Sequence, residues 1–385
     1  MDKKFVMGIA AMAALTLVSC SSDDLDSFSD NSSKNEAISF DGYLGRSAVA
    51  VSGTRGSEVK IGNLQADGFG VFGKYTSAKN QTSDLFINQQ VTYDKSTDPA
   101  KWTYSPLKFW PSDGHIDFLA YAPYDKNTTL TENSKINFKV AEKVADQKDL
   151  LWTNDMNHQI TAKITSAKDK VKFQFHHALS RLGYNVTLSG DYFSSGATFT
   201  VNKITLAGSP DGTSKKAFYK TGTIDLSKIV TKNNTENNKV DLSKTNTGTG
   251  LWTAETSDKQ NFDLVSSDQP LNQTGIKSGD NYLFVIPQDF SQTKTEGGSD
   301  VDELYVYVEY TINYGGTTGS VTNKVYKQIK KHFLQGNAYM LNLTLGLPIE
   351  FDVDVTGGGV DAGVDGWGTD EGINIGSNDT PWERK

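Results

Sequence analysis

Three groups of residues in this chain of 385 residues could take part in covalent chemistry. Cys20 carries the only thiol, a nucleophile that can be alkylated. Arg46 and Arg55 stand among Gly and Ser, where a protease that recognises a guanidinium could cut. His177 and Ser180 could form a general base and a nucleophile. The sequence around each group shows which of these chemistries it favours.

The segment before Cys20 predicts a secretory signal over residues 1–19. A basic start at Met1–Lys4 precedes an uncharged apolar run of about fourteen residues. That run is shorter than the roughly twenty residues that a membrane-spanning helix needs. The order Leu-Val-Ser-Cys at 17–20 resembles the lipobox of bacterial lipoproteins. The resemblance implies that the Cys20 sulfur carries a diacylglycerol, with palmitate-like acyl chains, as the first residue of the mature protein.

Residues 20–35 predict an acidic tether. They are polar, with few large apolar side chains, and cannot bury enough surface to offset the entropy of ordering. Their start, "SSDD" after Cys20, resembles the export tag of surface lipoproteins in Bacteroides-like bacteria. Each acyl chain contributes about 0.8 kcal/mol per buried CH₂, so several chains would hold the precursor firmly at the outer membrane.

The histidines and the charge balance argue against several other functions. His176 and His177 are adjacent, so on a strand they point to opposite faces, and we expect one in the core and one on the surface. Ser180 lacks a Gly-x-Ser-x-Gly turn. We therefore predict no enzyme activity, no metal site and no cofactor. The chain has 46 Asp and Glu against 38 Lys and Arg and no basic stripe, which argues against a nucleic-acid partner.

The rest of the chain predicts an all-β fold. Residues 38–43 alternate apolar or small side chains with polar or amphipathic ones, the period of two that places one set against a core. Further short strands follow, separated by turn residues, as in a β-sandwich. We expect residues 209–280, rich in Ser, Thr, Asn, Lys and Gly, to be exposed loops. The predicted strands are 68–75, 89–94, 101–111, 115–124, 172–188, 198–208, 281–290, 303–316, 325–330 and 338–347.

Several motifs occur in a fixed order along the chain. They are the lipobox, "TRG" at 54–56, "GFGVFGKY" at 68–75, the set Trp102, Tyr104, Pro106, Trp110 and Pro111, "FLAYAPY" at 118–124, "FHHALSRL" at 175–182 and "GNAYMLNLTLGL" at 336–347. Each motif is weak by itself, whereas the ordered set is specific. Together they resemble one protein family, the fimbrillin-like proteins, which are subunits of type V pili on Gram-negative anaerobes. The resemblance covers residues 36–367.

The resemblance implies two tandem transthyretin-like β-sandwich domains, at 36–168 and 169–356, and a Gly-rich tail at 357–385. In that tail, "GINIG" at 372–376 is a candidate for a further short strand. The resemblance also implies an assembly route from a lipid-anchored outer-membrane precursor to an extracellular fimbrium for cell adhesion. An arginine-specific surface protease removes the amino-terminal segment, and a strand of another pilus subunit fills the vacated place by donor-strand exchange. The position in stalk, anchor or tip, and any host or bacterial surface ligand, stay open.

Arg46 and Arg55 are the candidate maturation sites. They are two of four arginines, and no lysine occurs between Lys34 and Lys60. Cleavage at Arg46 would release the first predicted strand with the lipid anchor, and cleavage at Arg55 would also release "SAVAVSG". We favour Arg46 because it follows that strand at once, and two ordinary surface arginines remain the alternative.

The candidate donor strand is "IEFDVDV". Ile349, Phe351, Val353 and Val355 share one face, and acidic residues occupy the other. Burying these four side chains at ~1.5–3 kcal/mol each would supply roughly 6–12 kcal/mol before ordering costs. The same alternation would serve an ordinary last strand of the chain's own second domain, so both interpretations stand.

A surface lipoprotein that binds glycans without polymerising is the alternative function. Aromatic rings with a polar end suit sugar-binding faces. Tyr305 and Tyr307, and likewise Trp102 and Tyr104, are spaced so that alternate residues of a strand could be exposed. Packing in the core or on a sheet face is the commoner role for such residues.

Overall fold

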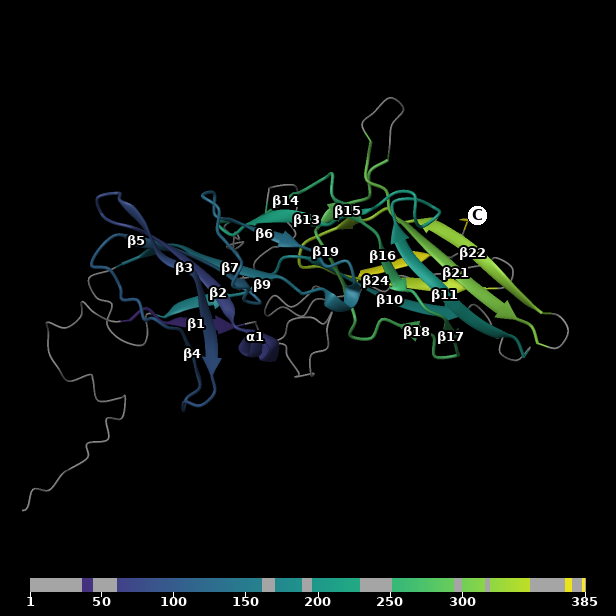
Figure 1. The fold of residues 1–385 in the computed structure, drawn as a ribbon, viewed down its shortest axis with the longest axis horizontal. Helices are drawn as coiled ribbons and strands as arrows, with labels where there is room; N and C mark the ends of the chain where they lie inside the picture. Colours follow the sequence, from purple (N-terminus) through teal and green to yellow (C-terminus); the bar gives the residue numbers. More distant parts are fainter. Residues whose placement is uncertain are drawn as a thin grey trace, which may run out of the picture.

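The chain forms two layered β-units joined in the middle by a short shared sheet (Figure 1). The structure is a computed structural model. It describes residues 37–43, 61–160, 170–188, 196–228, 251–293, 300–315, 319–346, 371–375 and 383–384. The all-β prediction is confirmed, since strands dominate these residues and the α-helix α1 (Ile61–Asp67) is short.

The first unit is built on a six-stranded sheet in the order β4-β3-β2-β5-β7-β9. Its strands are β2 (Phe69–Thr76), β3 (Thr82–Asp94), β4 (Lys101–Thr103), β5 (His115–Ala122), β7 (Leu151–Gln159) and β9 (His176–His177). A second layer contains the pair β1 (Phe40–Tyr43) and β8 (Val171–Gln174). A cluster rich in buried aromatic residues fills the space between the layers.

Helix α1 leads into this sheet through a tight turn. Leu64 is buried in the first cluster, and Gly68 follows the last helical residue with a φ of 71°. The Gly68 N–H donates to the Leu64 carbonyl at 2.9 Å, which closes the helix. A Cβ on Gly68 would lie 2.4 Å from the Val91 carbonyl oxygen, so only glycine fits there.

The second unit contains two facing sheets. One has the order β18-β10-β24-β25, with β19 also on β10, and the other has the order β16-β11-β21-β22-β26, with β17 also on β11. The strands of the first are β10 (Ser180–Leu188), β18 (Ile276–Lys277), β19 (Leu283–Val285), β24 (Ala338–Leu345) and β25 (Glu371–Ile375). Those of the second are β11 (Thr198–Ala207), β16 (Phe262–Val265), β17 (Gln269–Leu271), β21 (Tyr305–Asn313), β22 (Ser320–Gln328) and β26 (Glu383–Arg384).

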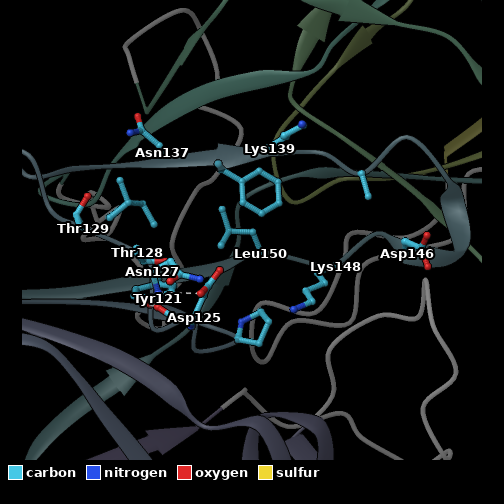
Figure 2. A pocket seen from close by; sticks show the side chains of 14 residues that line it. Tyr121, Asp125, Asn127, Thr128, Thr129, Asn137, Lys139, Asp146, Lys148 and Leu150 are labelled. Atoms are coloured by element: carbon cyan, nitrogen blue, oxygen red, sulfur yellow. Dashed lines mark hydrogen bonds between the residues drawn. The ribbon is translucent and has the colours of Figure 1, made fainter.

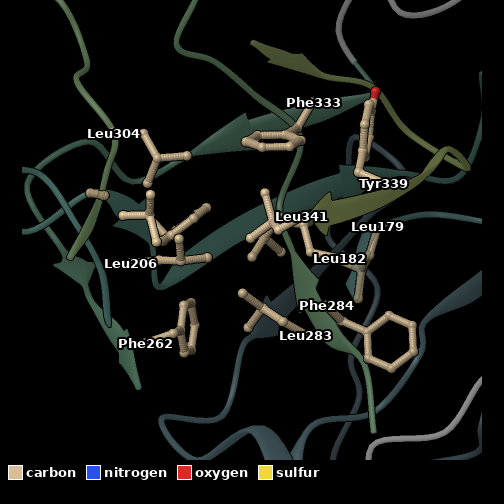
Figure 3. Packing of buried hydrophobic residues seen from close by; sticks show 14 of the residues in the cluster. Leu179, Leu182, Leu206, Phe262, Leu283, Phe284, Leu304, Phe333, Tyr339 and Leu341 are labelled. Atoms are coloured by element: carbon tan, nitrogen blue, oxygen red, sulfur yellow. The ribbon is translucent and has the colours of Figure 1, made fainter. Parts of the chain in front are cut away.

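Alternating side chains from both sheets form the core of the second unit. Figure 3 shows Leu206 and Phe262 of one sheet in the same cluster as Leu182 and Leu341 of the other. All four are at most 1% exposed. Strand β25 confirms the candidate strand at 372–376 over the residues that are described, and it lies parallel to β24 at the sheet edge.

A three-stranded sheet, in the order β14-β13-β6, connects the units. Strand β6 (Lys135–Lys139) precedes β7 in the chain, whereas β13 (Thr221–Asp225) and β14 (Trp252–Ala254) follow β11. Two small antiparallel pairs complete the fold, β12 (Phe218–Tyr219) with β15 (Lys259–Gln260) and β20 (Gln288–Asp289) with β23 (His332–Phe333).

The expectation of loops over 209–280 is wrong for much of that segment. Strands β12 to β18 lie within it, and Phe218, Ile224 and Phe262 are buried. These strands are only two to five residues long. Strands this short, with no more than three apolar residues each, do not show a period against the polar background.

The Gln147 side-chain amide forms hydrogen bonds that connect the two units at their junction. The Gln147 Oε1 atom accepts a hydrogen bond of 2.7 Å from the Phe284 N–H, and its Nε2 atom donates to the Ala141 carbonyl at 3.1 Å. Gln147 is only 4% exposed, so both bonds are shielded from water. The predicted domain division near residue 168 stays a prediction, since β8 and β9 lie after it and pair with β1 and β7.

Replacing Gln147 with alanine tests the contribution of these hydrogen bonds to stability. Gln147→Ala leaves the buried Phe284 N–H without its acceptor, which costs ~1–3 kcal/mol. We expect the free energy of unfolding in urea to fall by that amount. Gln90→Ala, at an exposed position of β3, should change it by less than ~0.5 kcal/mol. Equal effects of the two substitutions would contradict the role given to Gln147.

Candidate functional site

Strand β1 is bonded on both sides, although it comes from the chain's leading segment. It pairs in parallel with β8 along all four of its residues. On the other side, Ala37 forms an antiparallel bridge with Phe109, and the Ile38 N–H donates to the Lys108 carbonyl at 2.8 Å. The leading segment therefore occupies an interior position in its layer.

Phe40 fills the centre of an aromatic cluster. Its ring centroid lies 5.4 Å from that of Phe86, 5.4 Å from that of Tyr104, 5.8 Å from that of Phe118 and 5.6 Å from that of Phe173. The side chain is 3% exposed. The pairs with Phe86 and Phe118 are edge-on and the pair with Phe173 is stacked, and aromatic pairs of these kinds each contribute ~0.5–1.5 kcal/mol beyond the burial of area.

Two side chains of the cluster also bond to the backbone of the leading segment. The Tyr104 hydroxyl donates to the Ile38 carbonyl at 2.7 Å, and the Trp102 Nε1–H donates to the Gly42 carbonyl at 3.1 Å. We refer to the residues that surround this segment as the β1 seat. The β1 seat comprises Phe69, Phe86, Trp102, Tyr104, Phe118, Phe173 and Phe175.

The alternation predicted for residues 38–43 is confirmed for the side chains that are described. Ile38, Phe40 and Gly42 are buried, whereas Ser39 and Asp41 are half-buried on the other face. The backbone at Gly42 lies close to the surrounding rings, because a Cβ there would lie 3.0 Å from Phe69 Cε1 and 3.5 Å from Phe175 and Trp102.

Burial raises the pKa of Tyr104 above its usual value, and its hydrogen bond with the Lys108 backbone partly offsets the increase. The neutral hydroxyl is therefore the form that the β1 seat favours. A neutral hydroxyl can donate to the Ile38 carbonyl, whereas a phenolate cannot.

The chain connects β1 to the rest of the described unit only through residues 44–60. Strand β1 ends at Tyr43, and the next described element is α1. A cut between these elements would leave β1 held by non-covalent contacts alone. The segment 44–60 contains both candidate maturation sites, Arg46 and Arg55.

The predicted site residues themselves lie outside the described residues. These are the lipidation site Cys20, the cleavage sites Arg46 and Arg55, and the donor residues Ile349, Phe351, Val353 and Val355. The sequence thus located the strand that would leave, but it did not reveal the β1 seat. Phe69 and Phe173 lie within the predicted strands 68–75 and 172–188, Phe86 lies outside the predicted strands, and no sequence pattern placed the three together.

The prediction of one core and one surface histidine is wrong, because both are buried. His176 is 5% and His177 is 3% exposed. Strand β9 lies at the edge of the first sheet and is continuous with β10 of the second unit, so both of its faces are covered. The His177 Nδ1 atom lies 2.9 Å from Asp149 Oδ2. Ser180 donates to the Leu334 carbonyl at 2.8 Å.

The aromatic residues considered for sugar binding are largely in the core. Trp102 and Tyr104 belong to the β1 seat, and Tyr307 is only 7% exposed. Tyr305 is half-buried and stacks edge-on with Tyr326. These positions therefore do not form an open aromatic platform.

The described residues contain no group of three or more His, Cys, Asp or Glu side chains arranged to hold a metal ion. In the same part of the chain, no helix has the length and apolar character needed to cross a membrane.

The fold and the β1 seat define an all-β protein whose leading strand completes an aromatic core. The family model described as "Fimbrillin-like" matches residues 54–360, and the chain belongs to that family. The earlier resemblance is thereby confirmed. No curated protein matches the chain.

Several solved structures are similar to this chain, and the first of them shares its fold. A fimbrial protein from Bacteroides vulgatus is 21% identical, with a TM-score of 0.55, and the match covers 81% of this chain and 95% of that one. A candidate cell adhesion protein from Bacteroides uniformis is 16% identical, with a TM-score of 0.40 and coverage of 81% and 93%. A fimbrial assembly protein from Parabacteroides distasonis is 10% identical, with a TM-score of 0.34 and coverage of 80% and 91%.

Removing the Phe40 ring should destabilise the first unit strongly. Phe40→Ala deletes a buried aromatic side chain, which costs ~3–5 kcal/mol. Phe109→Ala, at a nearby position that is 52% exposed, should cost less than ~0.5 kcal/mol. Urea unfolding of the full-length chain measures both values. Similar losses for the two variants would show that β1 is not part of the core.

The raised pKa of Tyr104 predicts a pH dependence. Above pH ~10 an unfolded tyrosine loses its proton, while folded Tyr104 retains it, so stability falls as pH rises toward the folded pKa. Tyr104→Phe should lower stability at pH 7 by ~0.5–1.5 kcal/mol through the lost hydrogen bond. It should also show a smaller further loss between pH 9 and 11 than the native chain. Identical slopes in urea unfolding would contradict this assignment.

Proposed function

We propose that this protein is a structural subunit of a cell-surface pilus, in which β1 is removed by proteolysis and replaced by the carboxy-terminal segment of another copy. Membership of the fimbrillin-like family supports a structural or adhesive role in a pilus-type assembly. The structural match to a Bacteroides fimbrial protein agrees with that role at the level of the fold.

A sequence pattern that occurs twice in the chain supports the replacement of β1 by the carboxy-terminal segment. Residues 38–41 read ISFD and residues 349–352 read IEFD. In the first copy of this pattern, Ile38, just before β1, and Phe40, the first residue of β1, are buried. A strand that supplies isoleucine and phenylalanine at the same spacing and in the same chain direction can therefore present the same two side chains to the β1 seat.

The two strands differ at the position of Gly42, where the carboxy-terminal segment has Val353. Burying a valine side chain contributes ~1.5–3 kcal/mol, which favours the incoming strand. A Cβ at this place lies 3.0 Å from Phe69 Cε1 and 3.5 Å from Phe175 and Trp102, and the two γ-methyl groups of a valine reach further. Binding of Val353 here therefore requires these side chains to shift.

The position of Arg46 and Arg55 between β1 and α1 supports a maturation route by proteolysis. Cleavage at Arg46 or Arg55 severs the covalent link between β1 and α1, and no lysine lies between Lys34 and Lys60, so a protease specific for arginine suffices. The released piece carries Cys20 and its lipid. The subunit passes in this way from the outer membrane to an extracellular fimbrium that supports adhesion.

Protease treatment of the full-length chain tests the proposal. We expect an arginine-specific protease to shorten the amino end and to produce ladders of high mass on a gel. Phe351→Ala should weaken the joint about a hundredfold or more, since Phe→Ala costs ~3–5 kcal/mol. Asp352→Ala, on the opposite face, should polymerise as the native chain does.

Two results would contradict the proposal. One is equal polymerisation of the Phe351→Ala and Asp352→Ala variants. That result would show that the apolar face of the donor strand does not contribute to the joint between subunits. The other is a native chain that is cut and stays monomeric. The second result would favour the alternative, a surface lipoprotein that binds glycans without polymerising.

A further inference from the structure

Large apolar side chains are exposed as a pair on each of the two units. Among the described residues five such side chains are exposed, and four of them form the two pairs. Leu107 and Phe109, beside the leading segment, are 55% and 52% exposed. Tyr314 and Val321 are 38% and 49% exposed, at the tip of the β21–β22 hairpin, which lies at one end of the molecule (Figure 1). We refer to the first pair as the seat patch and to the second pair as the tip patch.

Neither patch belongs to the cavity beside β6 or to the hollow beside β3. The cavity beside β6, of about 430 Å³, is lined by none of the five exposed apolar side chains (Figure 2). The fifth, Ile87, lines the hollow of about 390 Å³ together with Phe72 and Leu130, which belong to the core cluster of the second unit. Single exposed apolar residues are common, whereas neighbouring ones mark surfaces that bind a partner.

The seat patch adjoins the start of β1. Phe109 forms the bridge to the leading segment, and the Ile38 N–H donates to the Lys108 carbonyl at 2.8 Å. In the register of the ISFD and IEFD patterns, Ile349 of an incoming strand takes the place of Ile38. Ile349 can donate the same bond, although its neighbour Pro348 has no N–H. A strand that enters the β1 seat in this register therefore passes the seat patch at Ile349.

The tip patch lies close to the end of β24, where the chain continues toward the candidate donor strand. The Tyr310 hydroxyl donates to the Gly346 carbonyl at 3.4 Å, just after β24 ends. Ile312 is the next residue but one on the same strand, and it pairs with Val321 on β22. From the rise along a strand and the spacing between strands, the backbones of Tyr310 and Val321 lie ~9 Å apart. The tip patch and the exit of the chain therefore share one end of the second unit.

Only a short length of chain separates that end from the candidate donor strand. Leu345 is the last residue of β24, and Ile349 follows four positions later. Four residues span at most ~14 Å when fully extended. If Ile349 of one copy occupies the place of Ile38 in a second copy, the end of the first copy's second unit lies within that distance of the place of Ile38. The tip patch of one copy and the seat patch of the other then meet at the same joint.

We propose that the tip patch of one copy packs against the seat patch of the next, as a second contact beside the exchanged strand. This contact rests on the strand exchange proposed above. It removes four apolar side chains from water, which favours the joint. The two patches are different surfaces of the same chain, so the contact can repeat from copy to copy along a filament. It also restricts rotation about the short linker, which an exchanged strand alone leaves free.

Cross-linking of the cut chain tests whether the patches meet. The full-length chain carries Cys20→Ser, which removes its only thiol, together with Phe109→Cys and Val321→Cys. The control carries Ile87→Cys in place of Phe109→Cys. After treatment with an arginine-specific protease, a short bismaleimide should link positions 109 and 321 of neighbouring copies, as measured by mass spectrometry of digested polymers. The control should polymerise without such links. Polymers that lack links between positions 109 and 321 would overturn the contact and leave the strand exchange intact.

Removing the apolar side chains tests what the contact contributes. Leu107→Ser combined with Phe109→Ser should speed the loss of subunits from polymers about tenfold or more, whereas Ile87→Ser should leave the native rate. The uncut variants should unfold in urea much as the native chain does, because these side chains are exposed in the single copy. A native rate of subunit loss for the double variant would overturn the contact alone. A cut native chain that stays monomeric would overturn both the contact and the strand exchange.

Discussion

The first unit depends on β1, a short strand that comes from the leading segment of the chain and completes the core of the unit. Ile38 and Phe40 complete its core, and Tyr104 and Trp102 bond to the backbone on either side of Phe40. Burial of the two apolar side chains contributes ~3–6 kcal/mol. Ordering residues 37–43 costs ~7–14 kcal/mol, so the backbone bonds and aromatic contacts decide the balance. If the chain were cut between β1 and α1, the strand would be held by these non-covalent contacts alone.

Strand pairing and side-chain hydrogen bonds at the junction connect the first unit to the second. Strand β6 of the first half pairs with β13 of the second, and the Asn154 side chain donates to the Leu226 carbonyl at 2.6 Å. The Trp252 Nε1–H donates to the Ala178 carbonyl at 2.7 Å. Load applied at the β1 seat can therefore pass through backbone and side-chain bonds into the second core.

The sequence predicted the features that depend on local pattern. The alternation at residues 38–43 identified β1 and its buried face, and the apolar runs at 68–75 and 338–347 identified β2 and β24 to within two residues. It could not predict that β1 pairs with β8, because parallel pairing across 130 residues leaves no local signal. It also missed the short strands β12 to β18 and the burial of both His176 and His177, which depend on what tertiary packing places beside them.

The central claim is that the β1 seat, once vacated, accepts the segment after β24. The most direct measurement is hydrogen exchange at the Val171 amide, which donates to the Ser39 carbonyl at 2.9 Å in the intact chain. Cleavage with an arginine-specific protease and removal of the leading segment should speed that exchange. A synthetic peptide of residues 347–356 should then restore slow exchange. Unchanged exchange after removal of the segment, or no protection by the peptide, would contradict the account.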